Sequence, residues 1–161
     1  MPAIKIEVCN KKMVGKLIKF IDLFWKKDHI FTQSRELFDW QHKAKNGNYN
    51  FILAVSTDTE EILGVLGFIT TQHFSGISLN HNEAWLAIWR VRDDVKVPGV
   101  GVSMLNFLRK KFNIDTFCGF GMNQLVIPLY KALKFTVSTL DHSVLINQNI
   151  SDFSVLKCGD W

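Results

Sequence analysis

The stretch KVPGVGVSML, residues 96 to 105, lies where a helix is predicted to begin. Two glycines, Gly99 and Gly101, stand at the beginning of a segment whose apolar residues recur at helical spacing. The first N–H groups of a helix have no partner inside the helix, and the helix dipole makes that end attractive to an anion. Glycines here leave room for the anion, so the pattern predicts a phosphate site at a helix N-terminus.

Two better-known glycine motifs do not match this stretch. A dinucleotide fingerprint needs a third glycine where Met104 stands, and an acidic residue about 20 positions further on, near Phe120. A Walker P-loop needs Gly-Lys-Ser/Thr, which the stretch lacks. A simpler interpretation stays open, in which the glycines only form a tight turn where a helix packs on a sheet.

The segments around the glycines predict a strand, a helix and a second strand. EAWLAIWRV, residues 83 to 91, has the composition of a strand, and the apolar residues of 100–112 recur at helical spacing. A short strand follows in DTFCGF, residues 115 to 120. This unit, residues 83 to 120, should form a right-handed parallel crossover.

Strands and helices are also predicted along the rest of the chain. The predicted strands are residues 3–8, 51–56, 62–70, 135–147 and 153–157, and the predicted helices are 14–24 after Asn10, a short one within 32–43, and 125–133. The strands at 51–56 and 62–70 should pair as a hairpin. The class is therefore α+β, with a mixed central sheet of about seven strands and about four helices.

Length and composition indicate one folded domain spanning residues 1–161. Of these residues, 47% are hydrophobic and 21% charged, which is ordinary for a globular protein. No apolar run reaches the roughly 18 to 20 residues that a membrane span needs, and the first residues do not resemble a secretory signal. We therefore expect a cytoplasmic protein with no membrane association.

The cysteines and the charge point to neither a metal nor nucleic acid. Cys9, Cys118 and Cys158 lie far apart and form no cluster with metal-ligand spacing, so we expect no bound metal and structural thiols. The net charge of +4 suits an anionic ligand, but it is spread over short lysine pairs. No nucleic-acid-binding motif accompanies it, so we do not expect nucleic acid as a partner.

Two motifs together resemble the GNAT superfamily of N-acyltransferases. Lys96-Val97-Pro98-Gly99-Val100-Gly101 resembles that superfamily's acyl-CoA signature, R/Q-x-x-G-x-G/A, which lies between its fourth strand and third helix. The later segment MNQLVIPLYKALKF resembles its Asn and Tyr block, with Asn123 and Tyr130 seven residues apart. The predicted order of elements resembles that fold over essentially the whole chain.

Three residues depart from the superfamily's pattern. Lys96 replaces Arg or Gln, and a lysine can still neutralise a phosphate as a point charge. Pro128 places the start of the last helix near itself, because proline fits only the first turn. Lys134 stands where glycine is usual, so a left-handed helix end there would be strained by roughly 1 kcal/mol.

The resemblance implies an acetyltransferase that uses acetyl-CoA as co-substrate. A neutral primary amine would attack the thioester directly in a ternary complex, with the pyrophosphate on residues 99 to 102 and the pantetheine arm beside the strand that ends at Val91. The cofactor-binding residues it implies are Trp89, Val91, Lys96, Val97, Gly99, Val100, Gly101, Val102 and Asn123.

The resemblance also implies catalytic roles. Tyr130 would protonate the departing thiolate, although a packed tyrosine with an idle hydroxyl is the simpler interpretation. The amine needs a general base, for which we favour His29, flanked by Asp28, with Glu83 second. His73 and His81 are further candidates, and a surface histidine is the alternative for His29.

The acceptor should be selected by the segment DHIFTQSRELFDWQH, residues 28 to 42. Phe38 and Trp40 could stack on a sugar or base, and Arg35 could meet a phosphate, unless the aromatic side chains are helix core. This segment, together with the later stretch LDHSVLIN, residues 140 to 147, is similar to GNAT domains of surface-polysaccharide biosynthesis, which acylate amino groups of nucleotide-linked deoxysugars. The expected partners are acetyl-CoA and a small-molecule amine, with a nucleotide aminosugar as one candidate, bound by a monomer or a homodimer.

Two alternatives remain at this level. A non-catalytic acyl-CoA-binding or regulatory module would carry the same glycine motif, and the 161 residues could form the N-terminal part of a longer protein.

Overall fold

The computed structural model describes residues 3–76, 80–141, 143 and 149. The chain divides into two compact units, Met1–Gly121 and Met122–Trp161, which are described separately below.

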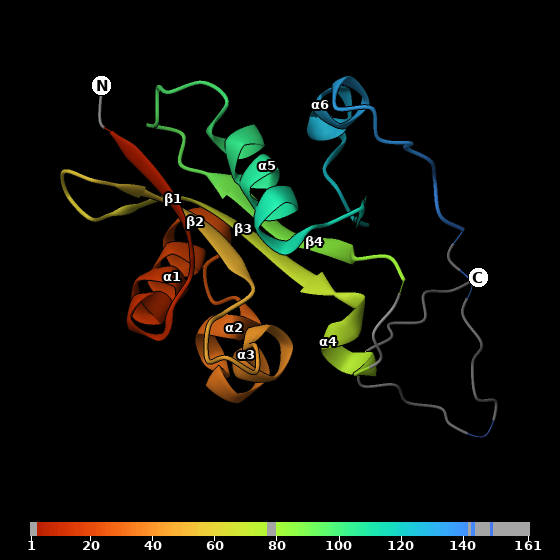
Figure 1. The fold of residues 1–161 in the computed structure, drawn as a ribbon, viewed down its shortest axis with the longest axis horizontal. Helices are drawn as coiled ribbons and strands as arrows, with labels where there is room; N and C mark the ends of the chain where they lie inside the picture. The colour runs from red at the N-terminus through yellow and green to blue at the C-terminus, as the bar shows by residue number, and fades with distance from the viewer. Residues whose placement is uncertain (1–2, 77–79, 142, 144–148, 150–161) are drawn as a thin grey trace. The chain divides into compact units, whose positions relative to one another are not determined.

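A five-stranded mixed sheet forms the centre of the first unit (Figure 1). Its strands are β1 (Ile4–Val8), β2 (Phe51–Ser56), β3 (Ile62–Thr70), β4 (Glu83–Val91) and β5 (Thr116–Cys118), in that spatial order. Neighbouring strands are antiparallel except for β4 and β5, which are parallel. The predicted hairpin and the predicted parallel pairing around the glycine motif are both confirmed.

Helices lie on both faces of this sheet (Figure 1). On one face, α1 (Val14–Phe20) and α3 (Arg35–His42) pack against β2 and β3 through a buried cluster that includes Leu17, Phe38 and Phe51. On the other face, α5 (Val100–Phe112) meets β3, where the rings of Phe68 and Phe112 lie 4.9 Å apart. Burial on both faces explains why β2 and nearly all of β3 are continuous apolar runs.

The helices before β2 begin at the polar residues that the sequence indicates. Asn10 accepts a hydrogen bond from the N–H of Lys12 at 2.9 Å and so caps the short turn η1 (Lys11–Met13) that leads into α1. A single π-helical turn, η2 (Ile21–Trp25), continues α1, and α2 (Ile30–Gln33) follows. Ser34 caps α3 by accepting from the N–H of Leu37 at 3.2 Å.

Two helices were not predicted: α2, which precedes α3 where a single short helix is predicted within residues 32–43, and a helix that follows β3. The chain forms α4 (Thr71–Ser75) directly after β3 and ends it at Gly76, whose φ of 65° is left-handed. No side chain caps α4, and five residues are too few to show a helical period, so the segment carries no sequence signal of its own.

The described part of the second unit contains η3 (Gln124–Val126) and α6 (Ile127–Ala132). Pro128 lies in the first turn of α6, as predicted. Lys134 follows the helix with a φ of 64°, so a lysine adopts the left-handed conformation at the position where the resembling proteins have glycine.

The predicted numbers of strands and helices need correction. The described residues contain five strands and six α-helices, rather than about seven and about four. Residues 135 to 141 of the predicted strand 135–147 are not a strand, because they form no ladder with another segment of the described chain. The rest of that predicted strand, except residue 143, lies outside the described residues. The predicted strand 153–157 and Cys158 also lie outside them.

Among the described residues, no helix has both the length and the apolar composition to cross a membrane.

Candidate active site

The helix α5 begins with an open N-terminus at Gly99. Gly99 has a φ of 77°, and a Cβ atom built on it would meet nothing within 4 Å. No side chain caps this end of α5, and its first turn contains no acidic residue. The first turn therefore has the features of an anion site, as the sequence predicts.

Gly101 serves a different purpose from Gly99. A Cβ atom on Gly101 would lie 3.1 Å from Nε1 of Trp89, a half-buried residue of β4. The indole therefore lies against the first turn of α5, and a side chain at position 101 would require the indole or the helix to shift by a few tenths of an ångström. The packing interpretation thus explains Gly101, whereas Gly99 is needed for its backbone conformation and the space beside it.

Arginines neutralise the carboxylates of the loop before α5. Arg90 pairs with Asp93 at 2.7 Å, and Arg92 binds both carboxylate oxygens of Asp94 at 2.9 and 2.5 Å. The hydrogen bond from Arg92 lowers the pKa of Asp94. Lys96 is exposed, three residues before Gly99. These pairings limit the repulsion that an anion at Gly99 would otherwise meet.

The strand β4 separates from β5 along most of its length. The parallel ladder joins only Glu83, Ala84 and Trp85 to β5. On its other edge, β4 stays paired with β3 up to Val91, with a bulge where Leu66 pairs with Trp89 but Phe68 pairs with Leu86. The part of β4 that leads to the glycine motif thus lies beyond its ladder with β5.

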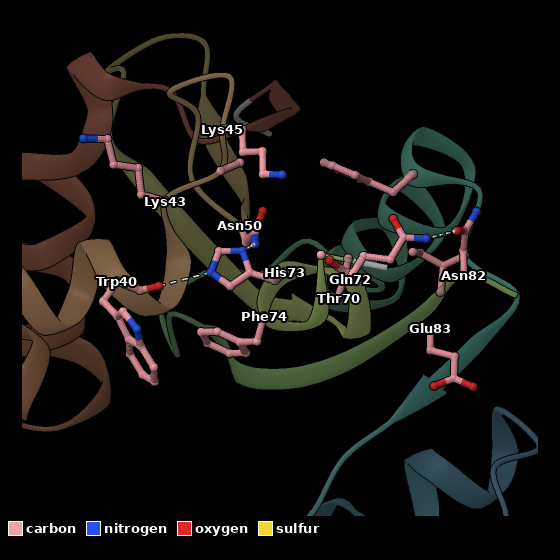
Figure 2. A pocket seen from close by; sticks show the side chains of 14 residues that line it. Trp40, Lys43, Lys45, Asn50, Thr70, Gln72, His73, Phe74, Asn82 and Glu83 are labelled. Atoms are coloured by element: carbon pink, nitrogen blue, oxygen red, sulfur yellow. Dashed lines mark hydrogen bonds between the residues drawn. The ribbon is translucent and has the colours of Figure 1, made fainter. Parts of the chain in front are cut away.

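A cleft of about 650 Å³ lies near the beginning of β4 (Figure 2). Its lining residues are Trp40, Lys43, Ala44, Lys45, Asn50, Thr70, Gln72, His73, Phe74, Gly76, Asn82, Glu83, Phe112 and Ile114. Two of the predicted site residues, Trp40 and Glu83, are among them. Its volume is in the range typical of small-molecule sites.

Glu83 and the cleft histidine are held by neighbouring side chains. Thr71 Oγ1 donates to Glu83 Oε2 at 3.2 Å. Nε2 of His73 lies 3.1 Å from the carbonyl oxygen of Trp40, and Nδ1 lies 3.4 Å from Nδ2 of Asn50. Both contacts fit a ring that donates from Nε2 and accepts at Nδ1.

His29 lies elsewhere and caps α2. Its Nδ1 accepts a hydrogen bond from the N–H of Phe31 at 3.2 Å, and burial, with a contribution from Lys26, lowers its pKa. A neutral ring held this way carries its proton on Nε2. The lone pair of Nδ1 already accepts from the N–H of Phe31, so it is not available to a substrate amine. The adjacent Asp28 is exposed, and its N–H donates to Asp22 Oδ1 at 2.9 Å. Neither residue lines the cleft.

The structure corrects the interpretation of Phe38. Its side chain is fully buried between α3 and the sheet, so it is core and cannot stack on a ligand. Arg35 is committed to a local network, with Nε 2.6 Å from Asp39 Oδ1 and Nη2 2.6 Å from the Tyr49 hydroxyl. Trp40, by contrast, is 62% exposed, and its ring lies 4.8 Å from that of Phe74.

The second unit holds the remaining predicted residues. Asn123 Oδ1 accepts from the N–H of Leu125 at 2.9 Å and caps η3. Tyr130 is buried, its ring lies edge-on to Phe135 at 5.1 Å, and burial raises the pKa of its hydroxyl.

The described cysteines show no sign of a metal site. Cys9 is buried, and this burial raises the pKa of its thiol to about 12, which makes it inert. The described residues contain no group of three or more His, Cys, Asp or Glu side chains that could hold a metal ion.

Sequence reasoning missed most of the cleft. Lys45, Gln72 and Phe74 were not predicted as site residues, because Gln72 and Phe74 lie on the unpredicted α4 and Lys45 lies in a turn. The sequence feature that could have pointed to these residues was His73, a candidate base that lines the same cleft.

Comparison with known proteins establishes the fold. No family model matches the chain, and no curated protein matches it. An aminoglycoside 6'-N-acetyltransferase from Acinetobacter baumannii superimposes with a TM-score of 0.62 at 18% identity, covering 92% of this chain and 100% of that one. An aminoglycoside N-acetyltransferase in complex with CoA gives 0.62 at 12% identity, covering 93% and 97%.

A third solved structure has a different kind of substrate in its name. The ribosomal-protein-alanine N-acetyltransferase of Brucella melitensis gives a TM-score of 0.61 at 9% identity and covers 89% of this chain and 100% of that one. The predicted GNAT-like fold is therefore confirmed.

Proposed function

We propose that this chain is an acetyl-CoA-dependent N-acetyltransferase that acts on a primary amine. The observation that carries the proposal is the open N-terminus of α5 at Gly99, which follows β4 after a short loop in a GNAT-like fold. Structural neighbours with the same fold are acetyltransferases, one of them in complex with CoA. At these identities the neighbours support the fold, and the reaction is inferred from it together with the glycine motif.

The pyrophosphate of acetyl-CoA would accept hydrogen bonds from the N–H groups of residues 99 to 102. Lys96 would add a positive charge, with Val97 beside it. Asn123 is also proposed to contact the cofactor. The pantetheine arm would run along β4 past Trp89 and Val91, in the manner of a peptide that adds to a sheet edge. An N–H group of β4 would stabilise the oxyanion, which is typically worth about 10²- to 10³-fold in rate.

The reaction needs a base, an acid and no covalent intermediate. The amine nitrogen attacks the thioester carbonyl, the C–S bond breaks, and the thiolate takes a proton. Tyr130 remains our proposed acid, because a tyrosine hydroxyl is protonated at neutral pH and can donate its proton to the thiolate. Burial raises the pKa of this hydroxyl, which keeps it protonated but makes it a weaker acid. For the base we now place Glu83 ahead of His29, because Glu83 lines the cleft and the Nδ1 lone pair of His29 is engaged by a backbone N–H.

The finer proposal for the acceptor is the amino group of a nucleotide-linked deoxysugar. It rests on the narrower resemblance of residues 28 to 42, and an exposed Trp40 at the cleft supports it, because tryptophan rings commonly stack on sugars and bases.

Thermal shift with acetyl-CoA and CoA tests the cofactor, and thiol release with a panel of primary amines tests the reaction. Lys96→Glu should raise the Kd for CoA about tenfold, as loss of a charge-assisted contact predicts. Lys110→Glu, at another exposed lysine on the far end of α5, is the matched control and should leave it unchanged.

Two outcomes would redirect the proposal. No stabilisation by either form of the cofactor would refute it. Cofactor binding without thiol release for any amine, unaffected by Tyr130→Phe, would instead indicate a non-catalytic acyl-CoA-binding module.

A further inference from the structure

We infer that the cleft of Figure 2 binds an acceptor that carries its amine at one end and an acidic group, phosphate or carboxylate, at the other. This inference rests on the proposed function, and it names the class of amine. It depends on three parts of the lining that differ in chemistry: a carboxylate, a lysine and a pair of exposed aromatic rings.

Glu83 supplies the carboxylate part. It is the first residue of β4, and its Oε2 is held by the Thr71 hydroxyl at 3.2 Å. Since β4 is the strand that leads to the glycine motif, an amine held at Glu83 would lie at the start of the same strand along which the acyl-CoA is proposed to bind.

Lys45 supplies the cationic part. Lys43 also lines the cleft, but its ammonium group lies 3.7 Å from Asp39 Oδ2, so part of its charge is balanced. Lys45 is exposed and forms no ion pair within the described ranges. Figure 2 shows Lys45 and Glu83 apart from each other, with Gln72 between them. A bound molecule that spans the cleft would therefore meet opposite charges at its two ends.

Trp40 and Phe74 supply the apolar part. Their rings lie 4.8 Å apart at 34°, and they are 62% and 52% exposed. His73 connects the two helices that carry them, because its Nε2 meets the carbonyl oxygen of Trp40 in α3. Large exposed rings held at a cleft provide a surface for the flat face of a sugar or base.

This charge pattern does not suit a polycationic acceptor. A molecule with several ammonium groups would place one of them near Lys45, where like charges repel. An amine with one acidic group would instead match both ends. The acceptor inferred for this chain thus differs in charge from the aminoglycosides in the names of its structural neighbours.

Four amino sugars with the same 2-amino group test the inference directly. Glucosamine, which has no acidic group, is the reference. Glucosamine 6-phosphate and UDP-glucosamine carry phosphate, and muramic acid carries a carboxylate. With saturating acetyl-CoA, we expect at least one acidic sugar to have a KM about tenfold or more below that of glucosamine, as a charge-assisted contact predicts. Kanamycin, a polycation, should be the poorest acceptor.

Substitution of Lys45 tests whether the lower KM of the acidic sugars arises from the cleft. Lys45→Met should remove the advantage of the acidic sugars over glucosamine, and Lys45→Arg should retain it. Lys110→Met is the matched control. Because both lysines are exposed, neither change should affect folding, which circular dichroism checks.

The possible results separate this inference from the proposed function. Equal or better use of glucosamine or kanamycin would overturn the acidic acceptor and leave the acetyltransferase in place. If no sugar is acetylated, NMR titration of the CoA-loaded protein with glucosamine 6-phosphate, UDP-glucosamine and muramic acid decides. Binding that Lys45→Met abolishes supports the inference, and no binding by any of them overturns it even where CoA binds. Failure of CoA to bind overturns the proposed function instead.

Discussion

The indole of Trp89 lies against the first turn of α5 so closely that a Cβ atom on Gly101 would be 3.1 Å from its Nε1. This contact joins β4, along which the pantetheine arm is proposed to run, to the helix end proposed to hold the pyrophosphate. A small change at Gly101 should therefore affect both packing and cofactor binding.

Gly101→Ala is expected to destabilise the protein by about 1 kcal/mol, because the added methyl group forces the indole or the helix to move. It should also weaken CoA binding, measured by calorimetry. Gly15→Ala is the matched control, since Gly15 lies within α1 with nothing within 4 Å of the added methyl group. That change should stabilise the protein by up to about 1 kcal/mol. A Gly101→Ala protein as stable as the Gly15→Ala protein would contradict the close contact.

Gly99→Ala should introduce about 1 kcal/mol of backbone strain at a φ of 77°. Gly47→Ala places the same strain at a φ of 80° in the turn before β2. Both variants should therefore lose similar stability in urea unfolding, but only Gly99→Ala should raise the Kd for CoA. Equal CoA affinities in the two variants would argue against an anion site at Gly99.

Tyr49→Phe tests whether Arg35 has a structural role. The Tyr49 hydroxyl accepts from Arg35 Nη2 at 2.6 Å and donates to Asp39 Oδ1 at 2.8 Å, with the tyrosine ring buried. Its loss should cost about 1–2 kcal/mol of unfolding free energy and leave the KM for the acceptor unchanged. A large increase in that KM would restore Arg35 as a substrate-binding residue.

The burial of His42 predicts that the free energy of unfolding falls in mild acid. Burial, and to a smaller extent His73, lowers its pKa to about 3, whereas in the unfolded chain it should titrate near its ordinary value of 6.5. Between these pH values the unfolded state binds a proton that the folded state does not. The part of the unfolding free energy that comes from uncharged His42 is therefore fully present above pH 6.5 and decreases as the pH falls. At pH 5 the loss should be about 2 kcal/mol.

His42→Leu should remove this part of the pH dependence, measured as urea unfolding free energy between pH 5 and 7.5. The exposed His81→Leu variant is the control and should keep the dependence of the original protein.

Much of the fold could be predicted from the sequence, because its signals are local. The strands β2, β3 and β4 begin and end where their apolar runs do, and Asn10, Ser34 and Pro128 mark helix starts by their own hydrogen bonding or ring geometry. The glycine motif is also a local signal, because glycine is favoured at position 99 by the backbone conformation of that residue itself.

The sequence by itself therefore determined the mixed sheet, the placement of the glycines at a helix N-terminus and the resemblance that implies acetyl-CoA. Only the tertiary structure decided that Phe38 is core, that the Nδ1 of His29 caps a helix, and that Trp40, His73, Phe74 and Glu83 line one cleft. The burial of Phe38 and the lining of the cleft depend on contacts between residues far apart in the chain, such as His73 with the carbonyl oxygen of Trp40. Local spacing cannot specify such contacts, because they form only when the helices pack on the sheet.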